Sequence, residues 1–258
     1  MGRYELLDNV AHADLRVVTR FGAAYGDAVA TVPAFPTEYA ELQREYPIFF
    51  HRHPDGSGFG SVALLGFEAG ENLFLDGERW DATYLPGHVA KGPFLIGFRE
   101  QWIDGALRDE PVLHVDLDHP RAGADDGDGE PVFLPGGGHG PHLQRVITVL
   151  HGIHAGVEGG RAMYAAFEAA GLIQPVDLDL RFDDDAGASL TGLYGIDRDR
   201  LAALDAATLH ALHRAGFLEG AYLQLASLHN IRHLMARKRR RLSARHGAPG
   251  AGVHAGMP

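Results

Sequence analysis

The sequence predicts an α+β fold, in which an N-terminal, mostly antiparallel sheet packs against a C-terminal helical region with an inserted β-hairpin. Three observations predict it. Short apolar runs typical of strands lie in the first half, and long stretches with apolar residues at helical spacing lie in the second half. Between those stretches, two alternating segments flank an acidic turn that ends in glycine. Strands followed by helices favour α+β over an alternating parallel sheet.

The first 118 residues are expected to supply most of the strands. Thr37 is a suitable N-cap and Pro47 cannot continue a helix, so a short helix is predicted over residues 38–46. Residues 53–58 have the composition of a turn. Strands are predicted within residues 15–32, 47–51, 60–67, 72–75 and 111–117, and a short helix followed by a strand within 84–98.

The second half is expected to be helical. Residues 120–141 are rich in Gly, Pro and Asp and are predicted to form a mobile surface loop. Asp197 and Asp205 are suitable N-caps, and Gly171 is a suitable C-terminal cap. Helices are predicted over residues 142–170, 205–215 and 217–241, and hairpin strands over 176–182 and 188–194.

These elements are expected to form one domain over residues 1–245. Its sheet-rich part is residues 1–118 and its helical part is residues 142–241, because the apolar helices need a sheet to cover. Residues 246–258 are rich in Gly, Ala and Pro, and a disordered tail is predicted there.

The composition limits both the chemistry and the location. The chain has 258 residues, of which 45% are hydrophobic, enough for a substantial core. Cysteine is absent, which excludes disulfides, thiolate nucleophiles and iron–sulfur clusters held by protein thiolates. No apolar stretch approaches the length of a spanning helix, and the first residues do not resemble a secretory signal. We therefore expect a soluble protein in the cytoplasm, without a transmembrane segment.

The charge is distributed unevenly. The net charge is −11, yet residues 232–246 hold seven basic side chains and no acidic one, so the rest carries 16 basic against 34 acidic groups. The acidic body is expected to repel nucleic acid, and an arm of consecutive basic residues is expected to contact an anionic partner. The alternative is a solvated helix end, where the helix dipole favours cations. The arm consists of Arg237, Lys238, Arg239, Arg240 and Arg241.

One spacing is typical of a metal site. His114 and Asp116 lie two residues apart on a predicted strand, so their side chains share one side. A His and a carboxylate, joined by a distant His, form the facial triad of non-haem iron(II) oxygenases. The third ligand would be His142, His151 or His154. The alternative is a strand end beside a polar loop, without a metal.

Other chemical signals are weaker. His229 and His233 lie one helical turn apart and could face one zinc ion, but no carboxylate lies between them and Arg232 would repel the cation. Packing at the end of the helix is the alternative. Schiff-base chemistry would have to use Lys91 or Lys238, the two lysines of the chain. No cofactor motif is present, so the cofactor, if any, stays unknown.

Several phrases of the sequence resemble those of the SapC-like family, named for an association with bacterial surface layers. The resemblance runs from about Tyr4 to Arg241 and carries no agreed chemistry. The phrases are YPIFF at residues 46–50, ALLGF at 63–67, GENLF at 70–74, LTGLY at 190–194 and SLHNI at 227–231.

Polar residues in or beside these phrases are candidates for a binding pocket. The alternative for those at positions 71 and 72 is a local bond to their own backbone in a tight strand connection. The candidate set is Glu71, Asn72, Tyr194, Asp197, His229 and Asn230.

Two functions are therefore expected from the sequence. The first is a soluble binding or accessory protein, linked to surface-layer or envelope processes as the resemblance implies. It would act on a protein partner, on a small molecule, or through self-association by the apolar face from Tyr222 to Leu228. The alternative is a metal-dependent enzyme similar to the non-haem iron oxygenases, using His114 and Asp116.

Overall fold

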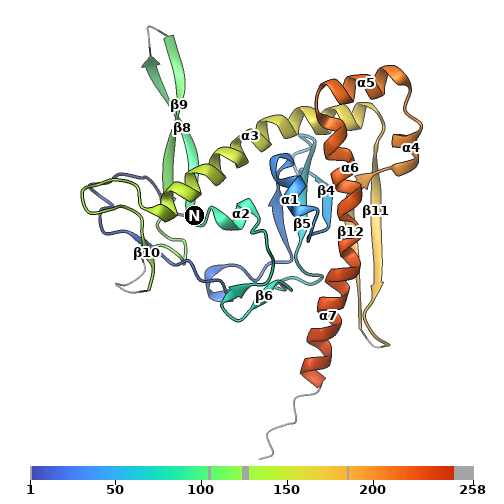
Figure 1. The fold of residues 1–258 in the computed structure, drawn as a ribbon, viewed down its shortest axis with the longest axis horizontal. Helices are drawn as coiled ribbons and strands as arrows, with labels where there is room; N and C mark the ends of the chain where they lie inside the picture. Colours follow the sequence, from blue (N-terminus) through green and yellow to red (C-terminus); the bar gives the residue numbers. More distant parts are fainter. Residues whose placement is uncertain (1, 104–105, 124–127, 185, 247–258) are drawn as a thin grey trace, which may run out of the picture.

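The computed structural model describes residues 2–103, 106–123, 128–184 and 186–246, and it has the α+β architecture that the sequence predicts (Figure 1). Its largest sheet is antiparallel, with the strand order β11-β12-β4-β5-β3, so the hairpin of the second half joins strands of the first half. These strands are β3 (Thr31–Ala34), β4 (Ile48–Arg52), β5 (Phe59–Leu64), β11 (Ile173–Arg181) and β12 (Gly187–Ile196).

Three smaller sheets complete the strands. In the order β1-β9-β8, the N-terminal strand pairs with a long hairpin. The pairs β10-β2 and β6-β7 are short. Their bounds are β1 (Tyr4–Leu6), β2 (Arg16–Val17), β6 (Leu75–Asp76), β7 (Arg79–Trp80), β8 (Phe94–Ile103), β9 (Ala106–Asp116) and β10 (Glu130–Pro131).

The long helices lie in the second half, as predicted. Helix α3 is followed by Gly171 with φ +64°, as expected of a C-terminal cap. Asp197 and Asp205 cap α4 and α5 through their side chains. The helices are α1 (Tyr39–Leu42), α2 (Gly87–Ala90), α3 (Pro141–Ala169), α4 (Arg198–Ala202), α5 (Ala206–Arg214), α6 (Phe217–Ser227) and α7 (Asn230–His246). None of the described helices combines the length and apolar character needed to cross a bilayer.

The helix predicted over residues 217–241 is divided in two at residues 228–229. Its polar side chains there bond to the backbone around the start of β4 instead of pointing to solvent. Ser227 Oγ accepts a hydrogen bond from Ile48 N at 2.9 Å, and Asn230 Nδ2 donates to Gln43 O at 2.8 Å. These buried bonds fix the break and join α6 and α7 to the sheet.

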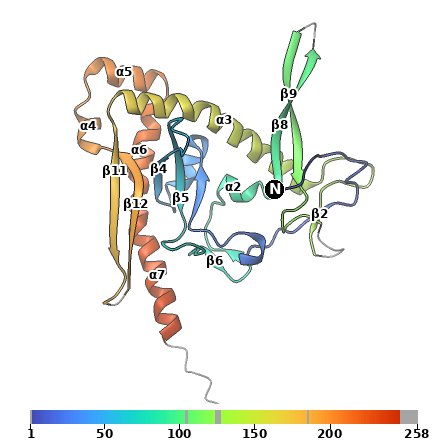
Figure 2. The same cartoon turned by 180° about the vertical axis from the view of Figure 1, so that it is seen from behind.

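The hairpin of β8 and β9 extends well beyond the strands predicted within residues 84–98 and 111–117. Its register runs from Phe94 opposite Val115 to Ile103 opposite Ala106. The hairpin projects from the body of the molecule (Figures 1 and 2). Polar residues are consecutive at 99–101 and 108–110, so the alternation that predicts a strand is interrupted in this segment. Near the tip, the Trp102 side chain is 72% exposed.

Two other predicted segments differ from the structure. The strand predicted over residues 72–75 is reduced to β6, because the Asn72 side chain turns the chain by bonding Phe74 N. The segment predicted as a mobile loop over residues 120–141 contains β10, and Val132 and Phe133 are buried there. Residues 124–127 of that segment and 247–258 of the predicted tail lie outside the described residues.

Helix α3 spans two hydrophobic cores. The main core lies between the large sheet and the helices, and α3 contributes Met163, Tyr164 and Phe167 to it. The second core lies between α3 and the sheet of β1, β8 and β9. Its buried members are Val17, Phe94, Val115, Val132, Phe133, Leu143, Val146 and Leu150. The N-terminal half of α3 therefore serves one core and its C-terminal half the other (Figure 1).

We predict that Gln224→Ala destabilises the fold by about 2 to 4 kcal/mol. Gln224 is fully buried, donates to Ile48 O at 2.8 Å and accepts from Ile196 N at 3.0 Å. The variant leaves both backbone groups without a partner. Urea unfolding measures the change, and Gln144→Ala on the exposed face of α3 is the control, expected within about 0.5 kcal/mol of the parent. Equal stabilities of the two variants would contradict this account.

Candidate functional site

Each of the six residues expected to form a pocket has a separate structural role. Asn72 is buried; its Nδ2 donates to Asp27 O at 2.8 Å and its Oδ1 accepts from Phe74 N at 2.9 Å. Glu71 accepts from Phe67 N at 3.0 Å through Oε2. Both side chains therefore bond the backbone around them, which was the alternative considered from the sequence.

The other four residues are likewise occupied elsewhere. The Tyr194 ring packs edge-on against Phe59, with centroids 5.1 Å apart, and Asp197 caps α4. The exposed His229 bonds the carbonyl of Ala226. Asn230, as described above, holds the loop before β4. None of the six lines the groove or the cavity described below.

The proposed facial triad is not assembled. The His114 imidazole lies directly over Gly97, where an added Cβ would be 2.5 Å from His114 Cε1. Asp116 Oδ1 accepts from Asp118 N at 3.1 Å. Within the described ranges, no three His, Asp or Glu side chains come together to hold a metal ion. The third ligand that this hypothesis requires is therefore missing from the described structure.

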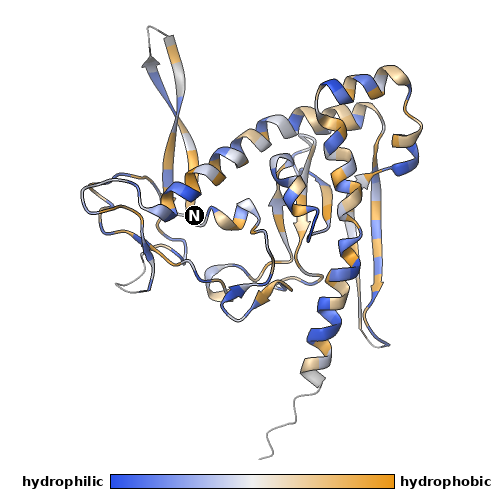
Figure 3. Ribbon diagram, viewed as in Figure 1, coloured by the Kyte–Doolittle hydropathy of each residue, from blue (hydrophilic) through white to orange (hydrophobic). Residues whose placement is uncertain are grey.

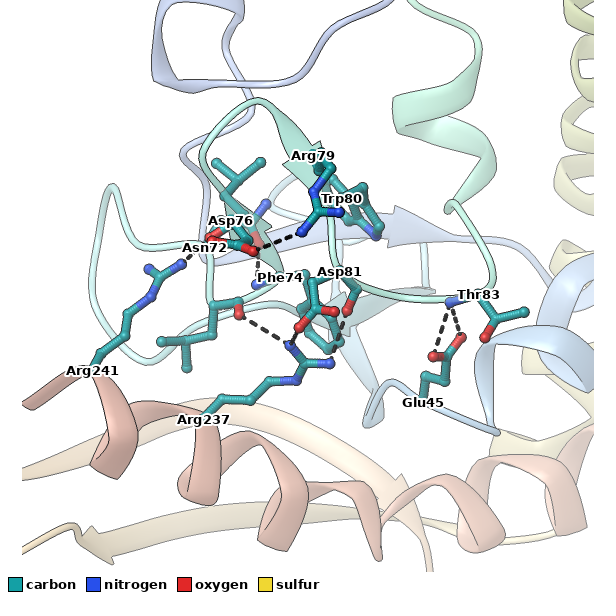
Figure 4. Close-up of polar contacts among 12 residues, drawn as sticks. Glu45, Asn72, Phe74, Asp76, Arg79, Trp80, Asp81, Thr83, Arg237 and Arg241 are labelled. Atoms are coloured by element: carbon teal, nitrogen blue, oxygen red, sulfur yellow. Dashed lines mark hydrogen bonds and ion pairs between the residues drawn. The ribbon is translucent and has the colours of Figure 1, made fainter. Parts of the chain in front are cut away.

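The basic arm is largely engaged within the chain. Arg237 forms an ion pair with Asp81, and its guanidinium lies 4.4 Å from the centroid of the Phe74 ring (Figure 4). Arg241 donates to Leu75 O (Figure 4). Arg239 donates to Phe182 O at 2.8 Å. Hydrophilic residues gather along this part of α7 (Figure 3). Their side chains bond residues in or beside the β6–β7 segment and the hairpin of β11 and β12.

Lys238 is the most buried member of the arm. Its Nζ lies 2.6 Å from Glu68 Oε1 and 2.9 Å from Glu71 Oε1, and the residue is 3% exposed. Hydrogen bonds and ion pairs with the two carboxylates outweigh burial and raise its pKa, so this amine stays protonated. Arg240 is exposed, and its side chain forms no ion pair in the described part of the chain. Most of the arm therefore stabilises the fold.

The apolar face expected for self-association is mostly covered. Leu225 is buried in the main core and Leu228 packs against it, whereas Tyr222 is exposed. Self-association through this face stays a prediction.

A groove between α3 and the sheet offers a different site. It has a volume of about 810 Å³ and lies between the C-terminal half of α3 and the turn that joins β4 to β5. Its polar interior is formed by His51, His53, Ser61 and Tyr164. Apolar walls and charged residues at the rim complete it: Pro33, Phe35, Pro36, Phe59, Val157, Ala165, Asp55, Arg161 and Glu168.

Glycine permits the close packing that shapes this groove. A Cβ on Gly156 of α3 would lie 2.7 Å from both Phe35 Cβ and Thr37 Oγ1. A Cβ on Gly60 would lie 2.9 Å from His51 Nε2 and meet the His53 ring as well. Larger residues at these two positions would displace α3 or the two imidazoles.

Three hydroxyl groups meet at the floor of the groove. Ser61 Oγ donates to Ala34 O at 2.7 Å and accepts from Tyr39 Oη at 2.7 Å. Tyr164 Oη lies 2.7 Å from Ser61 Oγ and 3.0 Å from Tyr39 Oη. Because the hydrogens of Ser61 and Tyr39 are committed, Tyr164 is the member that can redirect its hydrogen to a ligand. Burial raises the pKa of both tyrosines, so they remain neutral phenols.

The two imidazoles form the polar wall. Their ring centroids are 5.2 Å apart in an edge-to-face arrangement. Burial first, and the neighbouring His53 second, lower the pKa of His51, so His51 is neutral at pH 7. Neither imidazole is hydrogen-bonded to another side chain in the described part of the chain. The neutral His51 ring carries one donor and one acceptor nitrogen, and the His53 ring brings at least one further N–H donor to the groove.

This arrangement favours binding over covalent chemistry. Ser61 is bonded to two tyrosines and a carbonyl, so no general base activates it as a nucleophile. This site was not predicted from the sequence, although the signal was present. His51 and His53 share one side of a strand end by the alternation applied to His114 and Asp116.

We predict that His53→Ala raises the pKa of His51. Protonated His51 is repelled by its neighbour, and removal of His53 ends that repulsion while burial remains. An NMR titration of the imidazole signals measures the shift. His210→Ala, an exposed histidine on α5, serves as the control and should leave His51 unchanged. A pKa of His51 that stays constant or falls in His53→Ala would refute the proposed coupling.

We also predict that Lys238→Met destabilises the chain by about 1 to 3 kcal/mol, because it leaves the half-buried Glu71 carboxylate without its cation. Arg240→Met is the matched control from the same basic run and should change stability by less than about 0.5 kcal/mol. Chemical denaturation compares the two. A larger loss of stability in Arg240→Met than in Lys238→Met would contradict the structural role of the arm.

The comparisons with known proteins give one result. The family model described as SapC matches residues 7–234, which is most of the chain. No curated protein and no solved structure matches it. The matched range covers the large sheet, α3 and the α6–α7 junction, and it confirms the resemblance seen in the sequence phrases. The chain belongs to the SapC family.

Proposed function

We propose that this chain is a binding or accessory protein whose ligand occupies the groove between α3 and the β4–β5 turn. The observation that carries the proposal is the set of hydrogen-bonding groups at its interior. His51, His53 and Tyr164 all retain hydrogen-bonding capacity there. Buried polar groups are normally satisfied, so a row of groups with spare capacity along a groove supports a ligand.

The ligand that suits these groups is neutral and rich in hydroxyl groups, as a saccharide is. Hydroxyls both donate and accept, and so do the neutral His51 imidazole and the Tyr164 phenol. Charged side chains stand at the rim, where Glu168 is paired with Arg52 at 3.4 Å. Phe35 and Phe59 supply apolar walls for the faces of a ring. A strongly charged ligand would find no matching charge in the interior.

Two further parts of this proposal rest on the family. Its name implies a link to bacterial surface layers, and we propose an accessory role in surface-layer or envelope processes. We place that role in the cytoplasm, as expected from the sequence. Arg240, an exposed member of the basic arm without an ion pair in the described part of the chain, stays available for an anionic protein partner.

Cellobiose, a neutral disaccharide, tests the groove directly. The protein is labelled with 3-fluorotyrosine, and the signal of Tyr164 is assigned with Tyr164→Phe. We expect millimolar cellobiose to shift the Tyr164 signal saturably, because a bound hydroxyl would take up the phenolic hydrogen. Tyrosines far from the groove, such as Tyr222, should not respond.

Two tryptophan variants locate the binding. Ala165 and Ala162 are both exposed on α3, but only Ala165 lines the groove. Ala165→Trp should abolish the cellobiose response, and Ala162→Trp should leave it intact. The proposal fails if Tyr164 does not respond in the parent protein, or if both variants respond alike.

A further inference from the structure

A second cavity also borders β3, and Pro33 lines both it and the groove. It has a volume of about 180 Å³ and forms where α2 and the segment after β9 meet the N-terminal part of the chain. Its polar lining is Tyr25, Asp27, Thr31, His88, Lys91, His119 and Arg121. These residues take no part in the groove.

The buried pair of Arg121 and Asp27 forms one wall, and its charges cancel. Arg121 Nη2 lies 2.6 Å from Asp27 Oδ2, and both side chains are 6% exposed. Arg121 also donates to Val18 O at 3.1 Å, and Asp27 Oδ2 accepts from Gly22 N at 2.8 Å. Neither charge of this pair is left for a ligand to neutralise.

Lys91 has no such counter-ion. Its Nζ lies 3.4 Å from the carbonyl of the next residue, Gly92, and forms no ion pair within 4 Å in the described part of the chain. Burial lowers the pKa of Lys91, and the more distant Asp116 opposes this in part. A half-buried ammonium with unused hydrogens therefore borders the cavity.

The neighbours of Lys91 add further donors. His119 Nδ1 accepts from Arg121 N at 3.1 Å, so neutral His119 carries its proton on Nε2. Tyr25 Oη accepts from Arg20 Nη2 at 3.2 Å and keeps its own hydrogen to donate. Burial, reinforced by Lys91, lowers the pKa of His88 to about 4, so His88 is uncharged at pH 7. Donors thus surround the cavity, and its one carboxylate is already engaged.

We propose that Lys91, His119 and Tyr25 form a binding site for a small carboxylate anion. The ammonium supplies the charge that the ligand neutralises, and the imidazole and phenol supply neutral donors to its two oxygens. One uncompensated cation suits one negative charge, since the charges of Arg121 and Asp27 already balance each other. The cavity volume restricts the ligand to a few non-hydrogen atoms.

The presence of only two lysines makes a direct test feasible. Protein labelled with ¹³C at the lysine ε-carbon gives one signal for Lys91 and one for Lys238, assigned with Lys91→Met. Sodium acetate is titrated against sodium chloride at equal ionic strength. We expect acetate to shift the Lys91 signal saturably and chloride not to. Lys238, held by Glu68 and Glu71, is the internal control and should stay still.

A second variant tests the donor set without removing the reporter. His119→Phe keeps a ring but lacks the Nε2 donor, and it should weaken acetate binding about tenfold, read from the same Lys91 signal. Inorganic phosphate is titrated in parallel to test the choice of anion. The proposal is overturned if Lys91 does not respond to acetate, if chloride gives the same shift, or if phosphate binds and acetate does not.

Discussion

The close contact between α3 and residues 35–37 is the constraint on which the arrangement of this molecule depends. Gly156 lets the helix backbone touch Phe35 and Thr37, and Thr37 Oγ1 donates to Gly152 O at 2.9 Å. This contact fixes α3 against the edge of the large sheet. Tyr164, two turns further along, then reaches Ser61 on β5. The other half of the helix is free to carry the second core. One helix therefore lines the groove and contributes to both cores.

The basic segment of α7 shows how charge is used inside the fold. Sequence reveals charges but not the carbonyl groups that they meet in space. Backbone oxygens at β6 and just after β11 lie beside α7, and a buried carbonyl oxygen without a donor is costly. Arg239 donates to Phe182 O and Arg241 donates to Leu75 O. Arginines near a helix end can therefore serve as donors to neighbouring backbone, and such a run need not indicate an external anion.

The fold was more predictable from the sequence than the site. Helix α3 and the β11–β12 hairpin carry strong periodicity, and their existence and type were predicted. The break at residues 228–229 was not, because it depends on Ser227 and Asn230 finding buried backbone partners more than 170 residues away. For the site, polar residues in the family phrases proved to be structural. Asn72 and Asn230 donate to backbone carbonyls that lie far from them in the sequence.

The edge strand β3 favours a ligand site over the addition of a strand by a partner protein. β3 pairs only with β5 in this sheet, so its outer edge is a potential docking strand. Pro33 lies in its middle and has no backbone N–H, which interrupts the ladder that an added strand would need. The same residue borders both the groove and the Lys91 cavity. The edge is therefore closed to main-chain pairing and instead serves as the common wall of two cavities.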